Sequence, residues 1–262
     1  MSYAEQRHSL ISNPQQILAL EEYYQKLIVD FLRKKLQFIT DDFNASNDLI
    51  DYWIRYAPKP RGRTPKLDSF PWGEVGEKVL EAFLYGFASS LTSRFLGLPY
   101  GHDVRFVTDD AFVHIDIKSS GPRDVDDEIV ASPNQVSGDG IRMEADGFSN
   151  TPVQIKGPKS SSKIFQPELP PFYLHLGKTL PTLTYFLKCI YSVNPQTRHQ
   201  PLKYLELVCV PNGLILFDGL NYAKSTTGLL RPGKDDQNSK HPRARIKLLP
   251  LKTLGCWRVE RI

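Results

Sequence analysis

The chain has 262 residues, a formal net charge of +4 and a pI near 8.8. This length suits one large α/β domain, and the 40% hydrophobic content excludes a disordered chain. The three widely spaced cysteines predict a reducing, cytoplasmic compartment. The lack of an apolar run of about 18 residues predicts no membrane partner.

The N-terminal region predicts helices. Asn13 suits a helix N-cap and Pro14 the first helical position, so we expect a helix from Pro14 to about Thr40. Apolar residues follow Pro14 at helical spacing, which predicts one buried face. A second short helix is expected over Asn47–Tyr56.

A basic loop follows, with the sequence PKPRGRTPK over Pro58–Lys66. Prolines and a glycine predict extended backbone. Arg61, Arg63 and Lys66 suit a segment that lies along a phosphate backbone and displaces its counterions. A solvated surface loop is an equally good interpretation of the same residues.

An amphipathic helix is predicted over Ser69–Phe87. Glu77 lies on this helix, before the acidic stretch that follows. Its carboxylate has two interpretations, a third acid of a metal site or an ordinary surface glutamate.

The stretch from Asp103 to Lys118 predicts a β-hairpin. Val104–Val107 and the residues from Phe112 onward are rich in β-forming side chains, and Asp109 and Asp110 suit a two-residue turn between them. A two-residue turn places position 108 opposite 111, which fixes the register of the whole hairpin.

In this register Asp103 lies opposite Asp116, with Cβ atoms about 5 Å apart. Lys118 is two residues beyond Asp116 and shares its face of the sheet. Two carboxylates this close repel each other unless a positive group lies between them. A hard cation such as Mg²⁺ fits there, with Lys118 beside the reacting phosphate or water. The alternative is a surface hairpin with solvated charges.

Two long polar segments follow the hairpin and predict loops. The first begins directly after the hairpin and contains Asp124, which is placed to enter a groove beside a bound substrate. The second, Asn150–Pro171, carries Lys159 among several serines. Long ordered loops in a compact domain are usually functional.

The C-terminal part predicts a β-rich region with one further charged loop. Five strands are expected in this part, and Pro211–Gly213 suits a hairpin turn. The loop Arg231–Arg245 mixes basic residues with Asp235 and Asp236. Asp accepts hydrogen bonds from cytosine and Lys or Arg donates to guanine, so this loop suits contacts with bases; a solvated charged loop is the alternative. The expected strands are Leu183–Val193, Lys203–Val210, Leu214–Phe217, Ala244–Leu249 and Cys256–Ile262.

Several blocks resemble the BglI family of type II restriction endonucleases, within the PD-(D/E)xK nuclease superfamily. The proline of that motif is replaced by His102, and the segment between the two acids is shorter than in the family. The blocks follow the family's order: RGRTPK (Arg61–Lys66), FPWGEVGEK (Phe70–Lys78), GLPYGHD (Gly97–Asp103), VHIDIKSSGPRDVDDEIVASPNQVSG (Val113–Gly138), IKGPKSSSKIF (Ile155–Phe165), VPNGLILF (Val210–Phe217) and RPGKDD (Arg231–Asp236).

The resemblance implies a single restriction-endonuclease domain over residues 1–262, with a mixed β-sheet flanked by helices and an additional C-terminal β-rich part. It further implies a homodimer that cleaves both strands of double-stranded DNA at an interrupted palindrome, with one or two Mg²⁺ ions per active site. A cognate DNA methyltransferase is expected in the same system, outside any stable complex.

Site residues are carried over by motif. Asp103 and Asp116 match the metal-binding acids, Lys118 the catalytic lysine and Glu77 an acid on the supporting helix. We expect the Ile117 carbonyl to complete the metal ligands. The family contacts GCC half-sites through residues that match Asp124, Lys234, Asp236 and Arg243, with Arg245 as a rival to Arg243. Candidate contacts to the DNA backbone are Arg61, Arg63, Lys66 and Lys159.

Two other classes of function stay open. One is a different nuclease of the same superfamily, such as a repair or structure-specific enzyme. The other is a DNA-binding protein without catalysis. Digestion of a plasmid with Mg²⁺ and with EDTA separates all three, because only a restriction enzyme gives discrete metal-dependent fragments.

Overall fold

The computed structural model describes most of the chain. Its helices and strands are α1 (Tyr3–Ser12), α2 (Pro14–Ala45), α4 (Trp72–Leu91), β1 (Val104–Val107), β2 (Phe112–Ser120), β3 (Glu128–Ala131), β4 (Arg142–Glu144), β5 (Gly147–Ser149), β6 (Val153–Lys156), β7 (Ser162–Phe165), β8 (Phe172–His175), β9 (Lys178–Tyr191), β10 (Leu202–Val210), β11 (Leu230–Pro232), β12 (Ala244–Lys247), α6 (Leu248–Leu254) and β13 (Val259–Arg261). The described residues are 2–49, 52, 72–91, 102–122, 124, 127–144, 147–157, 162–197, 199–218, 228–232 and 242–262.

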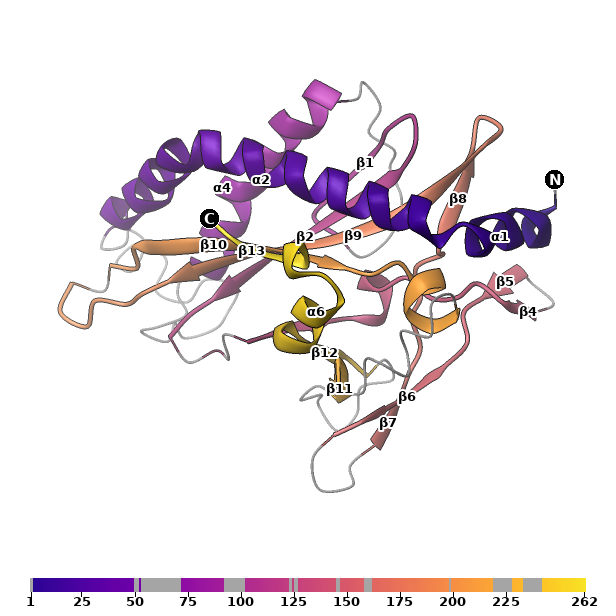
Figure 1. Cartoon of the computed structure of the whole chain (residues 1–262). Coiled ribbons are helices and arrows are strands. Elements are labelled where there is room, and N and C mark those ends of the chain that lie inside the picture. Colours follow the sequence, from indigo (N-terminus) through magenta and orange to yellow (C-terminus); the bar gives the residue numbers. More distant parts are fainter. Residues whose placement is uncertain are drawn as a thin grey trace.

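The largest sheet within these described ranges has six strands. Its order is β1-β2-β9-β10-β13, with β8 paired to the first part of β9. β2 and β9 run parallel from Phe112 opposite Thr182 to Ser120 opposite Ile190, whereas the other pairs are antiparallel. The sheet is therefore mixed, and it lies across the centre of the molecule (Figure 1).

Helices α2 and α4 cover one face of this sheet (Figure 1). Residues at helical spacing on α2, such as Ile28 and Leu32, are fully buried, as are Leu80 and Leu84 of α4. They pack against one alternating set of strand residues, which includes Ile115. This layer confirms the predicted α/β fold with helices flanking a mixed sheet.

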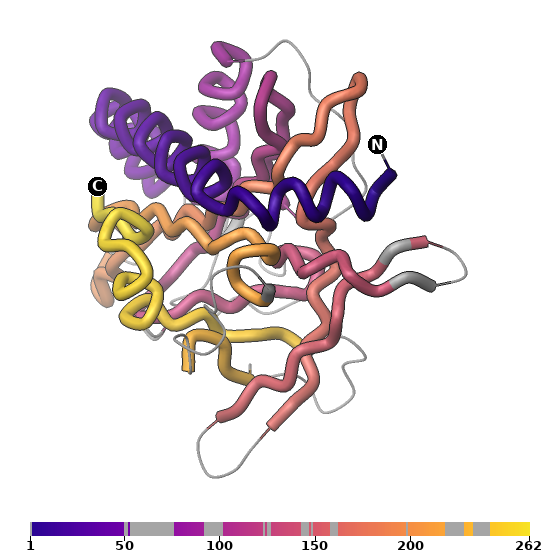
Figure 2. The backbone as a smooth tube through the Cα atoms, turned by 45° about the vertical axis from the view of Figure 1, so that its right-hand side comes forward, coloured from indigo at the N-terminus to yellow at the C-terminus, as the bar shows by residue number. Residues whose placement is uncertain are grey.

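The opposite face of the sheet carries a second core. Phe186 and Val208 point to this side and pack with residues of β3, β12 and α6. β11, β12 and β3 form a separate three-stranded sheet, and the β6–β7 hairpin projects from this side, away from α2 (Figures 1 and 2). This is the side on which Asp116 lies.

The helix predictions are largely confirmed. α2 begins at Pro14 as expected but continues to Ala45, five residues beyond the predicted end, and α1 precedes it. Asn13 stands at the N-cap, although its side chain makes no capping hydrogen bond. The helix expected over 69–87 is α4. Of the segment Asn47–Tyr56, the structure describes a 3₁₀ turn that ends at Leu49 and little beyond it.

The predicted strand Leu214–Phe217 is wrong, since Leu214–Asp218 forms a short π-helix. Asn212 is the physical reason. Its side-chain Oδ1 accepts a hydrogen bond from Leu214 N at 2.9 Å, and its backbone carbonyl accepts from Ile215 N and Leu216 N. Asn212 therefore starts a helical turn, and Pro211–Gly213 is not the turn of a hairpin.

Other boundaries also differ from the prediction. Ala244–Leu249 is strand only to Lys247, where α6 follows, and Cys256–Arg258 is a 3₁₀ turn before β13. Asn150–Pro171, expected to be irregular, contains the β6–β7 hairpin.

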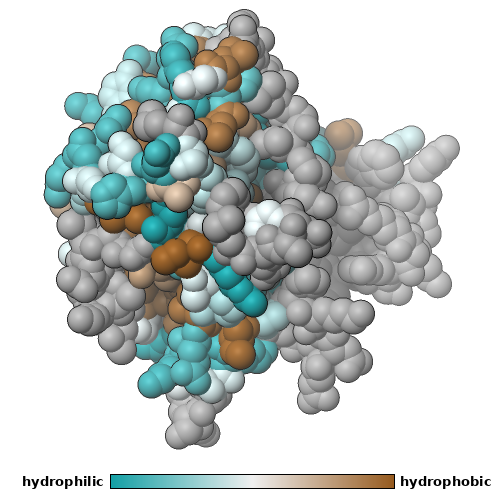
Figure 3. Space-filling view, turned by 90° about the vertical axis from the view of Figure 1, so that its right-hand side faces the viewer, coloured by the Kyte–Doolittle hydropathy of each residue, from teal (hydrophilic) through white to brown (hydrophobic). Residues whose placement is uncertain are grey.

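The molecular surface is mixed in character. On the face shown in Figure 3, hydrophilic and hydrophobic side chains stand in small interspersed groups among the coloured residues. Leu174 and Leu176, on the β8–β9 hairpin, are more than half exposed. Among the described residues, no helix is both long enough and apolar enough to cross a membrane.

Candidate active site

The β1–β2 hairpin has the register that its sequence predicts. Val104 pairs with Ile115 and Val107 with Phe112. Thr108 N donates to the Ala111 carbonyl at 2.9 Å, which closes a two-residue turn at Asp109 and Asp110. The predicted register of the two strands is therefore confirmed.

The turn of this hairpin is attached to the helical layer. The Tyr24 hydroxyl on α2 donates to Asp110 Oδ1 at 2.6 Å. Burial is the main cause that raises the pKa of Tyr24, and its hydrogen bond with Asp110 adds to the rise. The hydroxyl therefore stays protonated and keeps its role as donor.

Asp103 precedes the first residue of β1 and uses its side chain to extend the pairing. Its Oδ2 accepts a hydrogen bond from Ile117 N at 2.6 Å. The carboxylate thus binds an N–H group of β2 just beyond the last paired residue of the hairpin, Ile115. This bond fixes Asp103 beside the part of β2 that carries Asp116.

Asp116 and Lys118 share the face of β2 that is turned away from α2 and α4. Lys118 Nζ lies 2.6 Å from Asp116 Oδ2, a contact that is an ion pair without the alignment of a hydrogen bond. The side chain of Asp116 is 4% exposed and that of Lys118 is 31% exposed. The carboxylate is thus enclosed, and the ammonium reaches toward solvent.

The environment of Asp116 favours its neutral form. Burial raises the pKa of Asp116 to about 7, and the charges of Asp103 and Glu77 add to the rise, while Lys118 opposes it. A buried carboxyl with a pKa near neutrality beside a specific charge partner is typical of functional sites. A divalent cation at this carboxylate would favour the charged form.

Gln135 contacts both members of this pair. It lies in the 3₁₀ turn Pro133–Gln135 that follows β3. Its Nε2 donates to Asp116 Oδ1, and Lys118 Nζ donates to its Oε1 at 3.4 Å. Gln135 is not among the site residues predicted from the sequence, although it lies within the block Val113–Gly138 that resembles the restriction endonucleases. Its S-x-x-Q spacing from Ser132 is the capping-box pattern.

Two buried histidines stand beside the acids. His114 is on the same face of β2 as Asp116, and its ring centroid is 4.9 Å from that of His102. Burial lowers the pKa of His114 to about 3 and holds the pKa of His102 well below its usual range. Both rings are therefore neutral at physiological pH, and the ring centroid of Phe186 lies 6.1 Å from that of His102.

Glu77 approaches the site from the helical layer. Its neighbour Gly76 lies near Ser119 and Cys189, and α4 packs on the face of β2 opposite to Asp116. The charge of Glu77 raises the pKa of Asp116, so the two carboxylates interact electrostatically. Within the described residues, however, no three His, Cys, Asp or Glu side chains form a group able to hold a metal ion.

The oxygen atoms at the site nevertheless suit a hard divalent cation. Asp103 and Asp116 bring carboxylates to this part of β2, and the Ile117 backbone, whose N–H donates to Asp103, also carries the carbonyl expected as a ligand. Mg²⁺ is usually held by one or two protein carboxylates, and water and substrate phosphate complete its ligands. Two acids and one carbonyl therefore fit this mode of binding, in which substrate supplies the remaining oxygens.

Of the predicted base-contacting residues, the structure describes two. Asp124 is exposed shortly after β2, and its Oδ2 accepts from Gly121 N at 2.7 Å. Arg243 is exposed just before β12. Lys234 and Asp236 lie outside the described residues, as do the four candidate backbone contacts Arg61, Arg63, Lys66 and Lys159.

Arg245, the rival to Arg243, has a partner within the small sheet. It forms an ion pair with Glu128 of β3, and Lys247 contacts the same carboxylate at 3.0 Å. These bonds run between β12 and β3, which are paired strands. The charges of Arg245 and Lys247 therefore stabilise the sheet that carries the C-terminal loop.

Known restriction endonucleases share the fold of this chain. The family model described as restriction endonuclease BglI matches residues 1–262, so the chain belongs to this family of restriction endonucleases. A relative within the class is the type II restriction enzyme BglI of Bacillus subtilis, which is 37% identical over 280 residues, covering 97% of this chain and 93% of that one.

Solved structures agree. The crystal structure of restriction endonuclease BglI bound to its DNA recognition sequence superposes with a TM-score of 0.90 at 36% identity, over 99% of this chain and 95% of that chain. The tetrameric restriction endonuclease SfiI bound to cognate DNA has a TM-score of 0.62 at 13% identity, over 93% and 83% of the two chains. The second likeness shows a shared fold.

Proposed function

We propose that this chain is a type II restriction endonuclease that hydrolyses both strands of duplex DNA with Mg²⁺ as cofactor. The observation that carries the proposal is the pairing of Asp116 and Lys118 on β2, with Asp103 bonded to the next backbone N–H. Membership of the restriction endonuclease family supports the reaction class.

Asp103, Asp116 and the Ile117 carbonyl would hold the metal. When bound, Mg²⁺ supplies Lewis acidity toward the phosphate and stabilises charge on the leaving oxygen. Lys118 lies beside these ligands and is exposed on one side, so its ammonium orients the attacking water or stabilises the charge on the phosphate. Asp116 is buried together with His102, His114 and Phe186, which limits its contact with bulk water.

Sequence recognition is proposed to use Asp124, Lys234, Asp236 and Arg243 at GCC-like half-sites. The exposure of Arg243 and the ion pair of Arg245 with Glu128 support Arg243 as the arginine that contacts a base. An interrupted palindrome requires two copies of the site, and we therefore propose a homodimer of single-domain chains over residues 1–262. A cognate methyltransferase would protect the host DNA.

A plasmid of known sequence tests this function. The purified protein should yield discrete fragments with Mg²⁺ and none with EDTA, and the mapped ends would give the site and overhang. A smear would point to a nuclease without fixed sites, and metal-independent binding without cleavage would point to a DNA-binding protein.

Variants connect the cleavage to the site. Removal of a metal ligand costs several kcal/mol of transition-state stabilisation, so Asp116→Ala and Asp116→Asn should cleave at least about 10³-fold more slowly, at 1.36 kcal/mol per tenfold. Asp116→Asn keeps the side-chain shape and controls for misfolding. Glu22→Ala removes an exposed carboxylate of α2 and should cleave like the wild type. Full activity in both Asp116 variants would end the assignment.

A further inference from the structure

Gln135 occupies a position between the proposed metal ligand and the proposed catalytic lysine. Its side chain is buried, and the residue is 8% exposed. One end of its amide contacts Asp116 Oδ1 and the other end is 3.4 Å from Lys118 Nζ. The residue reaches the site from a separate element, the turn after β3, and so connects that turn to β2.

The orientation of this amide is set by its own turn. Ser132 N donates to Gln135 Oε1 at 2.9 Å, which identifies the oxygen end of the amide because a backbone N–H requires an acceptor. The Nε2 end must then face Asp116, where a carboxylate requires a donor. Each end of the amide is therefore matched to its partner. A carboxylate at position 135 could still accept from Ser132 N but could not donate a hydrogen bond to Asp116.

Both oxygens of Asp116 have partners. Gln135 Nε2 contacts Oδ1 and Lys118 Nζ contacts Oδ2. A divalent cation that binds Asp116 competes with the Lys118 ammonium, because two cations cannot share one small carboxylate without repulsion. Gln135 Oε1 is the neighbouring acceptor that can keep Lys118 at the site when this exchange occurs.

We propose that Gln135 is a positioning residue of the active site, which orients Asp116 for the metal ion through Nε2 and retains Lys118 through Oε1. The inference rests on the proposed function, since it assigns Gln135 a part in the same metal-dependent cleavage. Gln135 does not touch DNA or metal in this role and acts through its two neighbours.

The decisive variant is Gln135→Met, which keeps the length of the side chain and removes both hydrogen-bonding ends. Loss of a group that orients a metal ligand typically costs about 10–100-fold in metal affinity or activity. We expect the Mn²⁺ dissociation constant, measured from the electron paramagnetic resonance of free Mn²⁺, to rise about 10–100-fold. The single-turnover cleavage rate should fall by a similar factor, while DNA affinity in EDTA stays within about twofold.

Asn134→Ala is the matched control, because it changes the adjacent residue of the same 3₁₀ turn. It should leave the Mn²⁺ dissociation constant and the cleavage rate near wild-type values. Equal losses in Asn134→Ala and Gln135→Met would assign the effect to the turn and overturn the inference. Wild-type values in Gln135→Met would overturn it as well.

Gln135→Glu separates a structural role from a positioning role. Glu and Gln both serve at the third position of a capping box, so the turn should be retained, while repulsion between Asp116 and the buried carboxylate introduced at position 135 should lower the unfolding temperature in EDTA. A carboxylate cannot donate to Asp116, and the cleavage rate should still fall at least about tenfold. Full recovery of the rate with Glu would contradict the proposal.

The metal measurement also keeps this inference distinct from the proposed function. If the wild type binds Mn²⁺ but does not cleave DNA, the proposed function fails. The comparison of Mn²⁺ binding between Gln135→Met and the wild type still tests the orientation of Asp116.

Discussion

Two of the buried pairs of a carboxylate and a cation in this molecule differ in what surrounds the pair. Glu21 Oε2 is 2.7 Å from Arg258 Nη2, and Asp116 Oδ2 is 2.6 Å from Lys118 Nζ. Burial is the main cause that raises the pKa of each carboxyl. The contact distances and the direction of the pKa shift therefore do not distinguish the two pairs.

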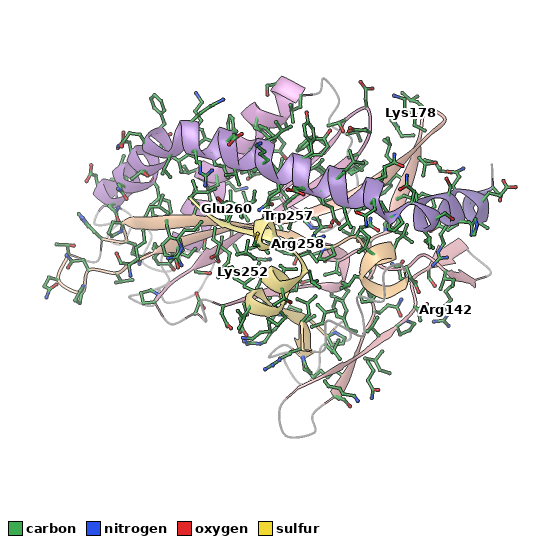
Figure 4. The ribbon with its side chains drawn as sticks, viewed as in Figure 1. Arg142, Lys178, Lys252, Trp257, Arg258 and Glu260 are labelled. Carbon is green, nitrogen blue, oxygen red and sulfur yellow. The ribbon has the colours of Figure 1, made fainter. Side chains whose placement is uncertain are left out.

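The surroundings do separate them. Neither side chain of the Glu21–Arg258 pair is exposed, and Glu21 Oε1 also accepts from Asn212 N at 2.5 Å. Arg258 belongs to the turn before β13, and Figure 4 shows it beside Trp257, below α2. This pair therefore joins the C-terminal segment to α2 and has no opening through which a ligand can replace either charge.

The Asp116–Lys118 pair is open on one side, because nearly a third of the Lys118 side chain is exposed. The cation can leave its carboxylate without entering the core. The closed pair is thus suited to stabilising the fold, and the open pair to exchanging one cation for another. Removal of Arg258 should therefore lower the unfolding free energy, whereas removal of Lys118 should lower the cleavage rate.

The largest expected effect is on the stability of the closed pair. Arg258→Met leaves the Glu21 carboxylate buried without its cation, which costs about 3–5 kcal/mol of unfolding free energy. Urea denaturation measures this loss, and the folded fraction should cleave DNA at the wild-type rate. Arg33→Met is the control, because the Arg33–Glu260 pair is largely exposed and contributes at most about 1 kcal/mol. A loss of unfolding free energy below about 1 kcal/mol for Arg258→Met would mean that the closed pair does not stabilise the fold more than an exposed pair does.

Removing the cation of the open Asp116–Lys118 pair should lower the rate of DNA cleavage. Lys118→Met removes an ammonium that stabilises developing charge, and we expect single-turnover cleavage with saturating Mg²⁺ to slow by about 10²–10³-fold. Lys178→Met removes a lysine that is 57% exposed, beside the hairpin turn at Asp109, and should leave the rate within about twofold. Equal rates for the two variants would show that Lys118 has no special place in the reaction.

The pH dependence of stability sharpens the comparison further. The folded-state pKa of Asp116 is about 7 against an ordinary value of 3.8, so its protonated form is favoured by folding. Its contribution to stability is complete below pH 3.8 and is lost as the pH rises through 7. Asp116→Asn removes this dependence, and its stability relative to the wild type in EDTA should increase by about 3 kcal/mol between pH 4.5 and 7.5.

Urea denaturation of both proteins at the two pH values measures this difference. The same change at both pH values would mean that Asp116 has an ordinary pKa in the folded protein. Added Mg²⁺ should reduce the difference at pH 7.5 by stabilising the wild type, because a ligand that binds only the folded state adds to its stability.

The hairpin shows how much of the site the sequence determines. A two-residue turn at Asp109 and Asp110 fixes every pair in β1 and β2, because the length of the loop sets the register of a hairpin. The closeness of Asp103 to the Asp116 region follows from counting. Local turn chemistry and strand periodicity were sufficient there, since both partners lie on one continuous hairpin.

Contacts between distant segments were beyond sequence reasoning. Gln135 reaches Asp116 from another element, and nothing in the residues around it specifies that approach. Leu214–Phe217 is a short apolar run, which suits a strand or a buried helical turn equally well by periodicity. The Asn212 side chain favours the helical turn, because its Oδ1 accepts a hydrogen bond from Leu214 N in the folded chain.

Glu77 gives the smallest expected effect and tests how far the open site extends. If it acts on Asp116 only through its charge, Glu77→Gln removes an interaction of about 1 kcal/mol. The cleavage rate should then change less than about tenfold, with a Mn²⁺ dissociation constant close to that of the wild type. The packing of α4 on the other face of β2 supports this expectation.

The control for Glu77→Gln is Glu81→Gln, one turn further along α4, where the carboxylate contacts Lys78 at 2.5 Å. It should leave cleavage unchanged. A loss of 10³-fold in Glu77→Gln, together with loss of Mn²⁺ binding, would make Glu77 a metal ligand that moves to the site with DNA. The active site would then include the N-terminal part of α4, and Glu77 and Asp116 would bind the metal together although they lie on opposite sides of β2.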